Sequence, residues 1–262
     1  MNHTLNAGGR LVELSSPIVM GILNATPDSF FAGSRKQTER EIAMRAQQIV
    51  SEGGVIIDVG ACSTRPGAEA VTEEEELRRL QLALEVVRRE VPEAIVSVDT
   101  FRPEVARRCV EQWGAHIVND VQPSQEMFRE VARLGVPYVL TSRAATMAEM
   151  LRCLACDVNT LHSLGQKDII IDPGFGFGKT VDENYAAMAR LEQLQCLGLP
   201  VLVGVSRKSM IWKTLGTTPD EALTGTVALH AVALRKGAAI LRVHDVREAV
   251  ETMAVIEKLG GG

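Results

Sequence analysis

Short runs of apolar, mostly β-branched residues recur along the chain and alternate with longer amphipathic stretches. Eight such runs cover residues 18–23, 55–59, 94–98, 116–118, 137–140, 168–171, 201–205 and 239–243. Because these runs are apolar nearly throughout, rather than at alternate positions, they are typical of strands buried on both faces of a parallel sheet. Amphipathic stretches with helical periodicity lie between the runs, for example at 39–51, 73–89, 103–113, 181–197 and 219–236.

Strict alternation of strand and helix predicts an α/β fold, a closed (β/α)8 TIM barrel. The length of 262 residues is close to the roughly 250 residues of one such barrel. No low-complexity segment or linker divides the sequence, so we expect a single barrel domain over residues 17–259, preceded by a lead-in over residues 1–16. The lead-in is expected to form a hairpin around Gly8 and Gly9. An open, doubly wound sheet is the alternative architecture.

Polar residues gather immediately after the apolar runs. The clusters lie at 24–30, 63–67, 99–100, 119–120, 172–179, 206–209 and 242–245. In (β/α)8 barrels the active site is built from the loops at the carboxyl ends of the strands. Clusters that share this structural position therefore predict one site assembled from many loops.

Bulk composition narrows the class of protein. The formal net charge is −5 and the pI about 5.6, so no overall basic field would attract nucleic acid. No apolar run reaches the roughly 18 residues that a membrane helix needs, and residues 1–6 lack the charged and apolar regions of a signal peptide. We therefore expect a cytoplasmic protein with small-molecule substrates and no nucleic-acid or membrane partner.

The five cysteines are an odd and scattered set, which makes a poor disulfide framework. Cys153 and Cys156, with His162 nearby, have the spacing of half a zinc site. The alternative, which we favour, is that both are small apolar residues of a helix, because no second Cys/His pair with suitable spacing follows.

Cationic and hydroxyl side chains follow three of the runs. Arg242 and His244 are separated by one residue, so on a strand they point to the same side. Segment 206–209 (SRKS) opens a helix, where backbone N–H groups and cationic side chains converge. The loops after strands seven and eight form the usual phosphate site of this fold, and segment 63–67 (STRPG) adds groups suited to oxyanions. Together they predict an anion site, although any single cation can also be a solvated surface charge.

Asp99, Asn119 and Asp172 each end an apolar run, so we expect them to be partly buried. A buried carboxylate is costly unless it is paired or hydrogen-bonded. These side chains either cap their loops or recognise the edge of a polar, planar heterocycle such as a pterin or purine; we favour recognition. Asn24 ends the first run, and a Mg²⁺ held by this one amide oxygen would need phosphate oxygens and waters to complete its shell.

Six ordered motifs together resemble the dihydropteroate synthase family, the folate-biosynthesis enzymes that sulfonamides target. The motifs are 20–30 (MGILNATPDSF), 57–60 (IDVG) with 63–67 (STRPG), 97–100 (SVDT), 172–179 (DPGFGFGK), 204–209 (GVSRKS) and 242–245 (RVHD). The resemblance runs from about residue 18 to residue 256, and the family has the (β/α)8 fold.

The resemblance implies a transferase. Its reaction joins 6-hydroxymethyl-7,8-dihydropterin diphosphate to 4-aminobenzoate and gives 7,8-dihydropteroate and diphosphate. The resemblance also implies Mg²⁺ and a dissociative loss of diphosphate, which leaves a cationic pterin methylene for the amine to attack. A homodimer formed through the later outer helices is implied as well.

Positions within the motifs imply roles for individual residues. The residues that would hold the pterin are Asp99, Asn119, Asp172 and Lys208. Those for the diphosphate are Asn24, Thr64, Arg242 and His244, with Mg²⁺ at Asn24. Those for the aminobenzoate are Phe30, Thr64, Arg65, Pro66 and Ser209. The residues that would carry the catalysis are Asp99, Lys208, Arg65 and Asn24. The loops at 24–33 and 63–67 would close over the site.

Two other functions fit parts of the pattern. A pterin-binding methyltransferase domain that acts with a corrinoid protein shares the barrel and the carboxylates, but it has no use for the anion site at Arg242 and His244. A catalytically inactive pterin-binding paralogue is favoured only by segment 140–147, which departs from the family's pattern after strand five. Cys62 also replaces an acidic residue common in the family, and Arg143 has no assigned role.

Overall fold

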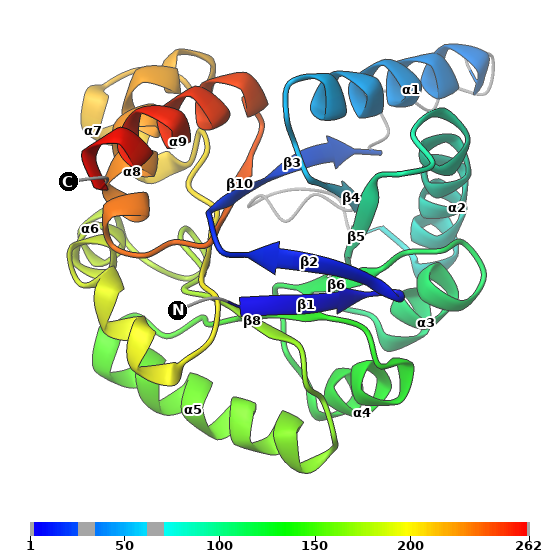
Figure 1. Ribbon diagram of the computed structural model, residues 1–262, viewed down its shortest axis with the longest axis horizontal. Helices are drawn as coiled ribbons and strands as arrows, with labels where there is room; N and C mark the ends of the chain where they lie inside the picture. Colours follow the sequence, from blue (N-terminus) through cyan, green and yellow to red (C-terminus); the bar gives the residue numbers. More distant parts are fainter. Residues whose placement is uncertain (1–2, 26–34, 62–70, 261–262) are drawn as a thin grey trace.

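The computed structural model describes residues 3–25, 35–61 and 71–260. Within these ranges, eight parallel strands form one sheet with helices around it (Figure 1). The strands are β3 (Ile18–Asn24), β4 (Ile56–Gly60), β5 (Ile95–Asp99), β6 (Ile117–Asp120), β7 (Tyr138–Thr141), β8 (Ile169–Asp172), β9 (Leu202–Val203) and β10 (Ile240–Val243). Each of the apolar runs overlaps one of these strands, which confirms the predicted α/β class.

The order of the strands closes the sheet into a barrel. Their sequence around the sheet is β8-β7-β6-β5-β4-β3-β10-β9. A parallel bridge between Ile171 and Val201 joins the two end strands, β8 and β9. An open doubly wound sheet would leave these strands apart, so the (β/α)8 prediction is confirmed.

Helices follow the strands and form the outer layer (Figure 1). They are α1 (Arg35–Ser51), α2 (Glu73–Glu90), α3 (Pro103–Glu111), α4 (Gln125–Leu134), α5 (Met147–Ser163), α6 (Val181–Ala189), α7 (Ser209–Leu215), α8 (Leu223–Arg235) and α9 (Val246–Gly260), with 3-10 turns η2 (Leu191–Leu197) and η3 (Pro219–Glu221). No helix of the described residues is long and apolar enough to cross a membrane.

Two of the expected helices are interrupted. The stretch predicted at 181–197 divides into α6 and η2 because Arg190 leaves the helical region, with φ −120° and ψ 17°. The stretch predicted at 219–236 divides into η3 and α8. There the carbonyl oxygens of Pro219 and Asp220 accept hydrogen bonds from the Arg207 side chain, at 3.1 and 2.7 Å. Tertiary contacts of this kind are invisible to helical periodicity.

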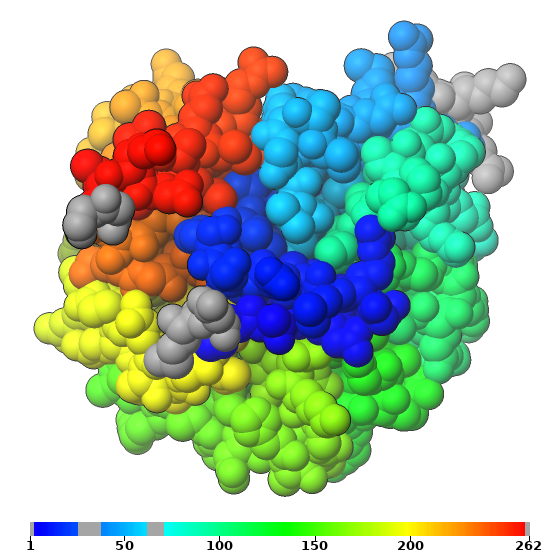
Figure 2. Space-filling view, in the orientation of Figure 1, coloured from blue at the N-terminus to red at the C-terminus, as the bar shows by residue number. Residues whose placement is uncertain are grey.

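An antiparallel hairpin fills one end of the barrel. It consists of β1 (His3–Ala7) and β2 (Arg10–Leu14), joined at Gly8 and Gly9, whose positive φ angles of 63° and 87° suit a tight turn. Its buried side chains, Leu5, Ala7, Val12 and Leu14, pack against the inward residues at the amino ends of the barrel strands. In Figures 1 and 2 the hairpin, in blue, crosses the middle of the face turned toward the viewer. The expected hairpin is therefore the floor of the barrel.

Candidate active site

The interior of the barrel changes from apolar to polar along the strands. Near the hairpin the inward positions are Met20, Ile56, Ile95, Ile117, Val139, Ile170, Leu202 and Ile240. Strand side chains alternate between faces, so the residue two positions further along also points inward. Those next positions are Ile22, Asp58, Ser97, Asn119, Thr141, Asp172, Gly204 and Arg242. A polar layer thus lies directly above an apolar one, toward the carboxyl ends of the strands.

Arg242 is the hub of this polar layer. Its Nε donates to Asp58 Oδ2 and its Nη2 to Asp99 Oδ2, both at 2.6 Å. The same Asp58 oxygen accepts from Asn119 Nδ2 at 3.0 Å. Arg242 belongs to β10, which pairs with β3, so the side chain crosses β3 to reach β4 and β5. The structure therefore joins the predicted pterin residues Asp99 and Asn119 to the predicted diphosphate residue Arg242.

Sharing one cation between two carboxylates leaves a net negative charge at this point. Burial raises the pKa of Asp99; Arg242 opposes the shift, and the nearby charges of Asp58, Asp120 and Glu76 reinforce it. The neighbouring residues in sequence point outward and have structural partners. Thr100 donates to Glu76 at 2.7 Å, and Asp120 accepts from the Tyr138 hydroxyl at 2.7 Å. In the sequence pairs Asp99–Thr100 and Asn119–Asp120, only the first residue faces the barrel interior.

Asp172 is buried at the end of β8, and a glycine loop holds it. Its Oδ1 accepts from the Gly174 amide at 2.7 Å, and no described residue bonds to its other oxygen. Burial raises the pKa of Asp172, while Lys208, the Gly174 amide and Arg242 oppose the rise. The arrangement leaves one carboxylate oxygen for a donor on a ligand.

Lys208 follows strand β9 and lies under the same glycine loop. Its Nζ donates to the carbonyl oxygen of Phe175 and lies 4.7 Å from the centre of the Phe177 ring. Burial lowers the pKa of Lys208 to about 8, although Asp172 favours the charged form. A half-buried ammonium group beside an aromatic ring and a carboxylate can bind a polar, planar ligand.

The 206–209 segment is only partly an anion site. Arg207, which was expected to add a cation, instead forms two bonds of 2.8 Å with Asp245. Its amide also donates to Thr226 at 3.0 Å, and its φ of 55° lies in the left-handed region. Arg207 therefore holds the loop in place through Asp245, which leaves Lys208 as the cation of this segment that faces the site. Ser209 is the first residue of α7 and half-buried.

His244 and Asn24 lie two positions beyond the inward-facing Arg242 and Ile22, at the mouth of the barrel. His244 contacts Ser206 Oγ through its Nδ1 at 3.1 Å, and its amide donates to the same oxygen at 3.2 Å. Burial, and next Arg242, lower the pKa of His244 to about 4, so the imidazole is neutral at physiological pH. Asn24 is exposed at the end of β3. His244 can therefore offer an anion a neutral N–H but no positive charge.

Several predicted site residues lie outside the described residues, namely Phe30, Thr64, Arg65 and Pro66. Their roles stay predictions, as does closure by the loops at 24–33 and 63–67. Cys153 and Cys156 lie on the exposed surface of α5. Among residues 3–25, 35–61 and 71–260, no group of three or more His, Cys, Asp and Glu side chains could hold a metal ion.

Sequence reasoning assigned no role to two charged residues of the site, although both lie within its motifs. Asp58 lies inside an apolar run, and that position was the available signal, because an inward carboxylate within a buried strand needs a partner. Lys179 donates to the carbonyl oxygens of Gly174 and Ser142, at 3.0 and 3.2 Å, and so fastens the glycine loop to the end of β7. Desolvation lowers its pKa to about 8.

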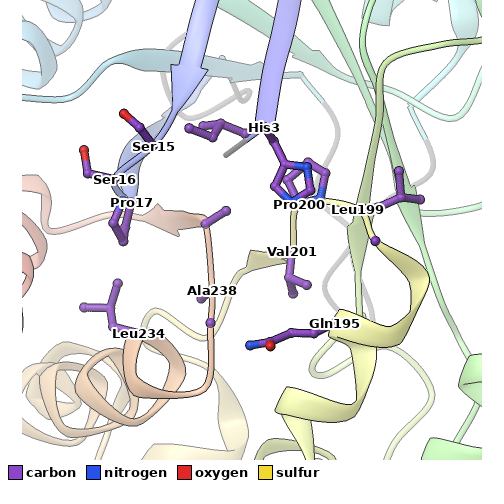
Figure 3. A pocket seen from close by; sticks show the side chains of 14 residues that line it. His3, Ser15, Ser16, Pro17, Gln195, Leu199, Pro200, Val201, Leu234 and Ala238 are labelled. Atoms are coloured by element: carbon purple, nitrogen blue, oxygen red, sulfur yellow. The ribbon is translucent and has the colours of Figure 1, made fainter. Parts of the chain in front are cut away.

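A separate cavity of about 230 Å³ lies at the opposite end of the barrel. It is lined by residues that precede β3, β9 and β10, among them Pro17, Val201 and Ala238 (Figure 3). The carboxyl ends of the strands are at the other end of the molecule, so this cavity is not the active site of a barrel enzyme.

Comparison with known proteins identifies the family. A family model for pterin binding enzymes matches residues 20–244. The dihydropteroate synthase of Escherichia coli (strain K12) is 40% identical in an alignment 270 positions long, which covers 97% of this chain and 95% of the relative. The chain belongs to the dihydropteroate synthase family.

Solved structures of the family agree with the fold throughout. A dihydropteroate synthase from Xanthomonas albilineans with 4-aminobenzoic acid is 38% identical, with a TM-score of 0.93 and coverage of 100% of both chains. The same organism's enzyme in complex with 7,8-dihydropteroate is 37% identical, with a TM-score of 0.90 over 99% of this chain and 100% of that chain. The match extends from the hairpin through α9, so the resemblance seen in the motifs covers the whole described barrel.

Proposed function

We propose that this protein is a dihydropteroate synthase. It would condense 6-hydroxymethyl-7,8-dihydropterin diphosphate with 4-aminobenzoate, and release 7,8-dihydropteroate and diphosphate, as a step of folate biosynthesis. The observation that carries the proposal is the inward polar layer at the carboxyl ends of the strands, with Asn119, Asp172 and Lys208 in a chain that matches dihydropteroate synthases over its whole length.

The pterin fits the polar groups at Asp172, Lys208 and Asp99. Asp172 offers a carboxylate oxygen to ring N–H and amino donors, and Lys208 offers an ammonium to a ring oxygen. Asp99, with its carboxylate beside the ring, would stabilise positive charge that develops as diphosphate leaves. The dissociative step needs no nucleophile and no general base from the protein, which agrees with a site made of recognition and charge-balancing groups.

The diphosphate fits Arg242 together with His244 and Asn24, which lie beyond it toward the mouth. Two of the five N–H bonds of Arg242 are occupied by Asp58 and Asp99, which leaves three for phosphate oxygens. His244 and Asn24 would add neutral donors. Bound Mg²⁺ would neutralise charge on the departing diphosphate. Because Asn24 supplies only one amide oxygen, substrate oxygens and waters would provide the rest of the shell.

Ser209 would contact the aminobenzoate carboxylate at the start of α7, and Phe30, Thr64, Arg65 and Pro66 would line the same pocket. Sulfonamides would then compete with 4-aminobenzoate. A homodimer would use the exposed apolar side chains of the later helices, Leu215, Val232, Val255 and Leu259. A cytoplasmic location also stays a prediction.

The decisive experiment is a coupled assay of diphosphate release by the purified protein. We expect release only when pterin diphosphate, 4-aminobenzoate and Mg²⁺ are all present. Absence of turnover at saturating substrates would refute the proposal. Binding of the pterin without chemistry would indicate an inactive paralogue, and binding of methyltetrahydrofolate without aminobenzoate-dependent release would indicate a methyltransferase domain.

Replacing Asp172 with alanine should weaken pterin binding while the fold persists. A hydrogen bond to a charged group is worth about 1.5–3 kcal/mol, so the pterin Kd should rise roughly 10- to 150-fold. Calorimetric titration with pterin diphosphate measures the change. Asp168→Ala is a matched control, since Asp168 accepts from the Asn6 amide at the hairpin end of the barrel. Equal affinities for Asp172→Ala and the parent protein would contradict the anchoring role.

Pterin recognition should fail as the medium becomes alkaline. The pKa of Lys208 is lowered by burial to about 8, so its charge is present below that pH and lost above it. We expect kcat/KM for pterin diphosphate, which reports ionisation of the free enzyme, to fall as the pH rises through about 8. Lys208→Arg should move this limb to higher pH.

Lys179 provides the control for that pH profile, because desolvation lowers its pKa to about 8 as well. Its ammonium group is occupied by the carbonyl oxygens of Ser142 and Gly174. Lys179→Arg should therefore leave the limb in place. If the alkaline limb moved with Lys179→Arg and not with Lys208→Arg, the ionisation would belong to Lys179, and the prediction for Lys208 would be wrong.

A further inference from the structure

Asp58 is a fully buried carboxylate that none of the roles above uses. It lies on the inner face of β4 with no exposed surface. Burying a charge is expensive unless partners compensate it, and its presence therefore needs an explanation. Replacement by an apolar residue would be the simpler solution if the strand served the core alone.

One oxygen of Asp58 receives both of its hydrogen bonds. Oδ2 accepts from Asn119 Nδ2 at 3.0 Å and from Arg242 Nε at 2.6 Å. These donors come from β6 and β10, which lie on opposite sides of β4 in the sheet. Asp58 is therefore the common point between a group proposed to read the pterin and a group proposed to bind diphosphate.

This contact also fixes the direction of the Asn119 amide. A carboxylate has only acceptors, so the NH₂ group must face Asp58 and the carbonyl oxygen must face away. Without the carboxylate, the amide could turn over and exchange a donor for an acceptor. The direction of the amide thus depends on the charge of a residue that need not touch the ligand.

Arg242 is fixed in a similar way. Its outer partner, Asp99, is 17% exposed and close to the mouth, whereas Asp58 is wholly buried. The Nε bond to Asp58 holds the inner end of the guanidinium, so its remaining N–H bonds keep one orientation. Asp99 alone would be enough to balance the charge of Arg242, so charge balance does not explain why Asp58 is also present.

We propose that Asp58 is a positioning residue, which through Oδ2 orients the Asn119 amide for the pterin and the Arg242 guanidinium for the diphosphate. This inference rests on the proposed function. It assigns to Asp58 an effect on pterin recognition that is transmitted by these two side chains. Asp58 has no contact with Ser209, the described residue proposed for the aminobenzoate, so binding of that substrate should not depend on it.

The test is a double-mutant cycle on pterin affinity, with binding of pterin diphosphate measured by calorimetry. Asp58→Asn keeps the shape and removes the charge. We expect it to raise the pterin Kd roughly 10- to 100-fold, while KM for 4-aminobenzoate changes less than twofold. In an Asn119→Ala background the same substitution should have a much smaller effect, because one of its routes to the ligand is gone.

Tyr138→Phe is the matched control. It also removes a buried hydrogen bond to a carboxylate, the one from the Tyr138 hydroxyl to Asp120 at 2.7 Å, but that contact points away from the barrel interior. This substitution should leave pterin affinity unchanged. Asp58→Glu, which retains the charge and moves the oxygen by one methylene, is the second variant if Asp58→Asn does not fold, and should weaken pterin binding similarly.

The outcomes separate this inference from the proposed function. A parent protein that does not bind pterin diphosphate refutes both. A parent protein that binds, with Asp58→Asn and Asp58→Glu binding equally well, overturns the positioning role alone. Fully additive effects of Asp58→Asn and Asn119→Ala would also overturn it, because they would show that Asp58 does not act through the amide.

Discussion

Replacing Arg242 with methionine should lower the free energy of unfolding by about 3–5 kcal/mol. The substitution removes the cation shared by Asp58 and Asp99 and leaves two carboxylates inside the barrel. Methionine fills much of the same volume, so the loss reports charge rather than packing. Denaturant unfolding, read as a shift of midpoint at constant slope, measures it.

The sign of the pH dependence provides an independent check. Burial already raises the pKa of Asp99 above its ordinary value, and removing Arg242 takes away the charge that opposes this shift. The protonated Asp99 is then tolerated in the folded state at acid pH, and stability is lost as the pH rises through the folded pKa. The deficit of the variant should therefore be smallest in acid and grow toward neutral pH.

Arg133→Met is the matched control for Arg242→Met. Arg133 also contacts two carboxylates, Glu111 and Glu130, but it is 51% exposed on the outer surface. Solvent screens such pairs, so little change is expected. A loss for Arg242→Met no greater than for Arg133→Met would mean that water reaches the interior pair.

Replacing Gly174 with alanine should be nearly as damaging. The φ of Gly174 is +67°, which costs an alanine about 1–2 kcal/mol. A Cβ there would also overlap the carbonyl oxygen of Ser142 and come within 2.9 Å of Thr141 Cγ2. Forcing the backbone aside adds about 1–3 kcal/mol.

Gly178→Ala separates these two contributions. Gly178 has the same φ of +67°, but the nearest atom to an added Cβ is the Arg143 carbonyl oxygen at 3.9 Å. This variant should show the conformational cost alone, whereas Gly174→Ala should lose more stability and also bind pterin more weakly, since the Gly174 amide holds Asp172. Thermal unfolding of the two variants measures the difference. Equal losses of stability would mean that the backbone at the end of β7 moves aside for the added methyl group at little cost.

The barrel could be predicted from the sequence because each inner strand is apolar on both faces. The same reasoning placed Asp99, Asn119 and Asp172 at strand ends, where the described structure has them facing inward. It missed Asp58 because a single carboxylate among apolar residues does not change the strand pattern. The contact of Asp58 with Arg242 spans 184 positions in the sequence and exists only because the barrel closes.

Arg207 shows the other limit of the sequence. Its neighbours Ser206, Lys208 and Ser209 suggested that it would face an anion, yet its left-handed backbone turns the side chain outward to Asp245. No residue-type preference predicts a positive φ for arginine, so this reversal depended on partners supplied by Thr226 and Asp245.

The hairpin at the floor of the barrel has a consequence for the order of events during turnover. With Leu5 and Val12 filling one end, molecules enter and leave through the opposite opening. Asn119 and Asp172 face this opening from the ends of β6 and β8, below His244 and Asn24. Under the proposed function, a pterin bound at this depth would have to enter before a second molecule could cover it, and the joined product would have to leave by the same opening before another pterin could bind.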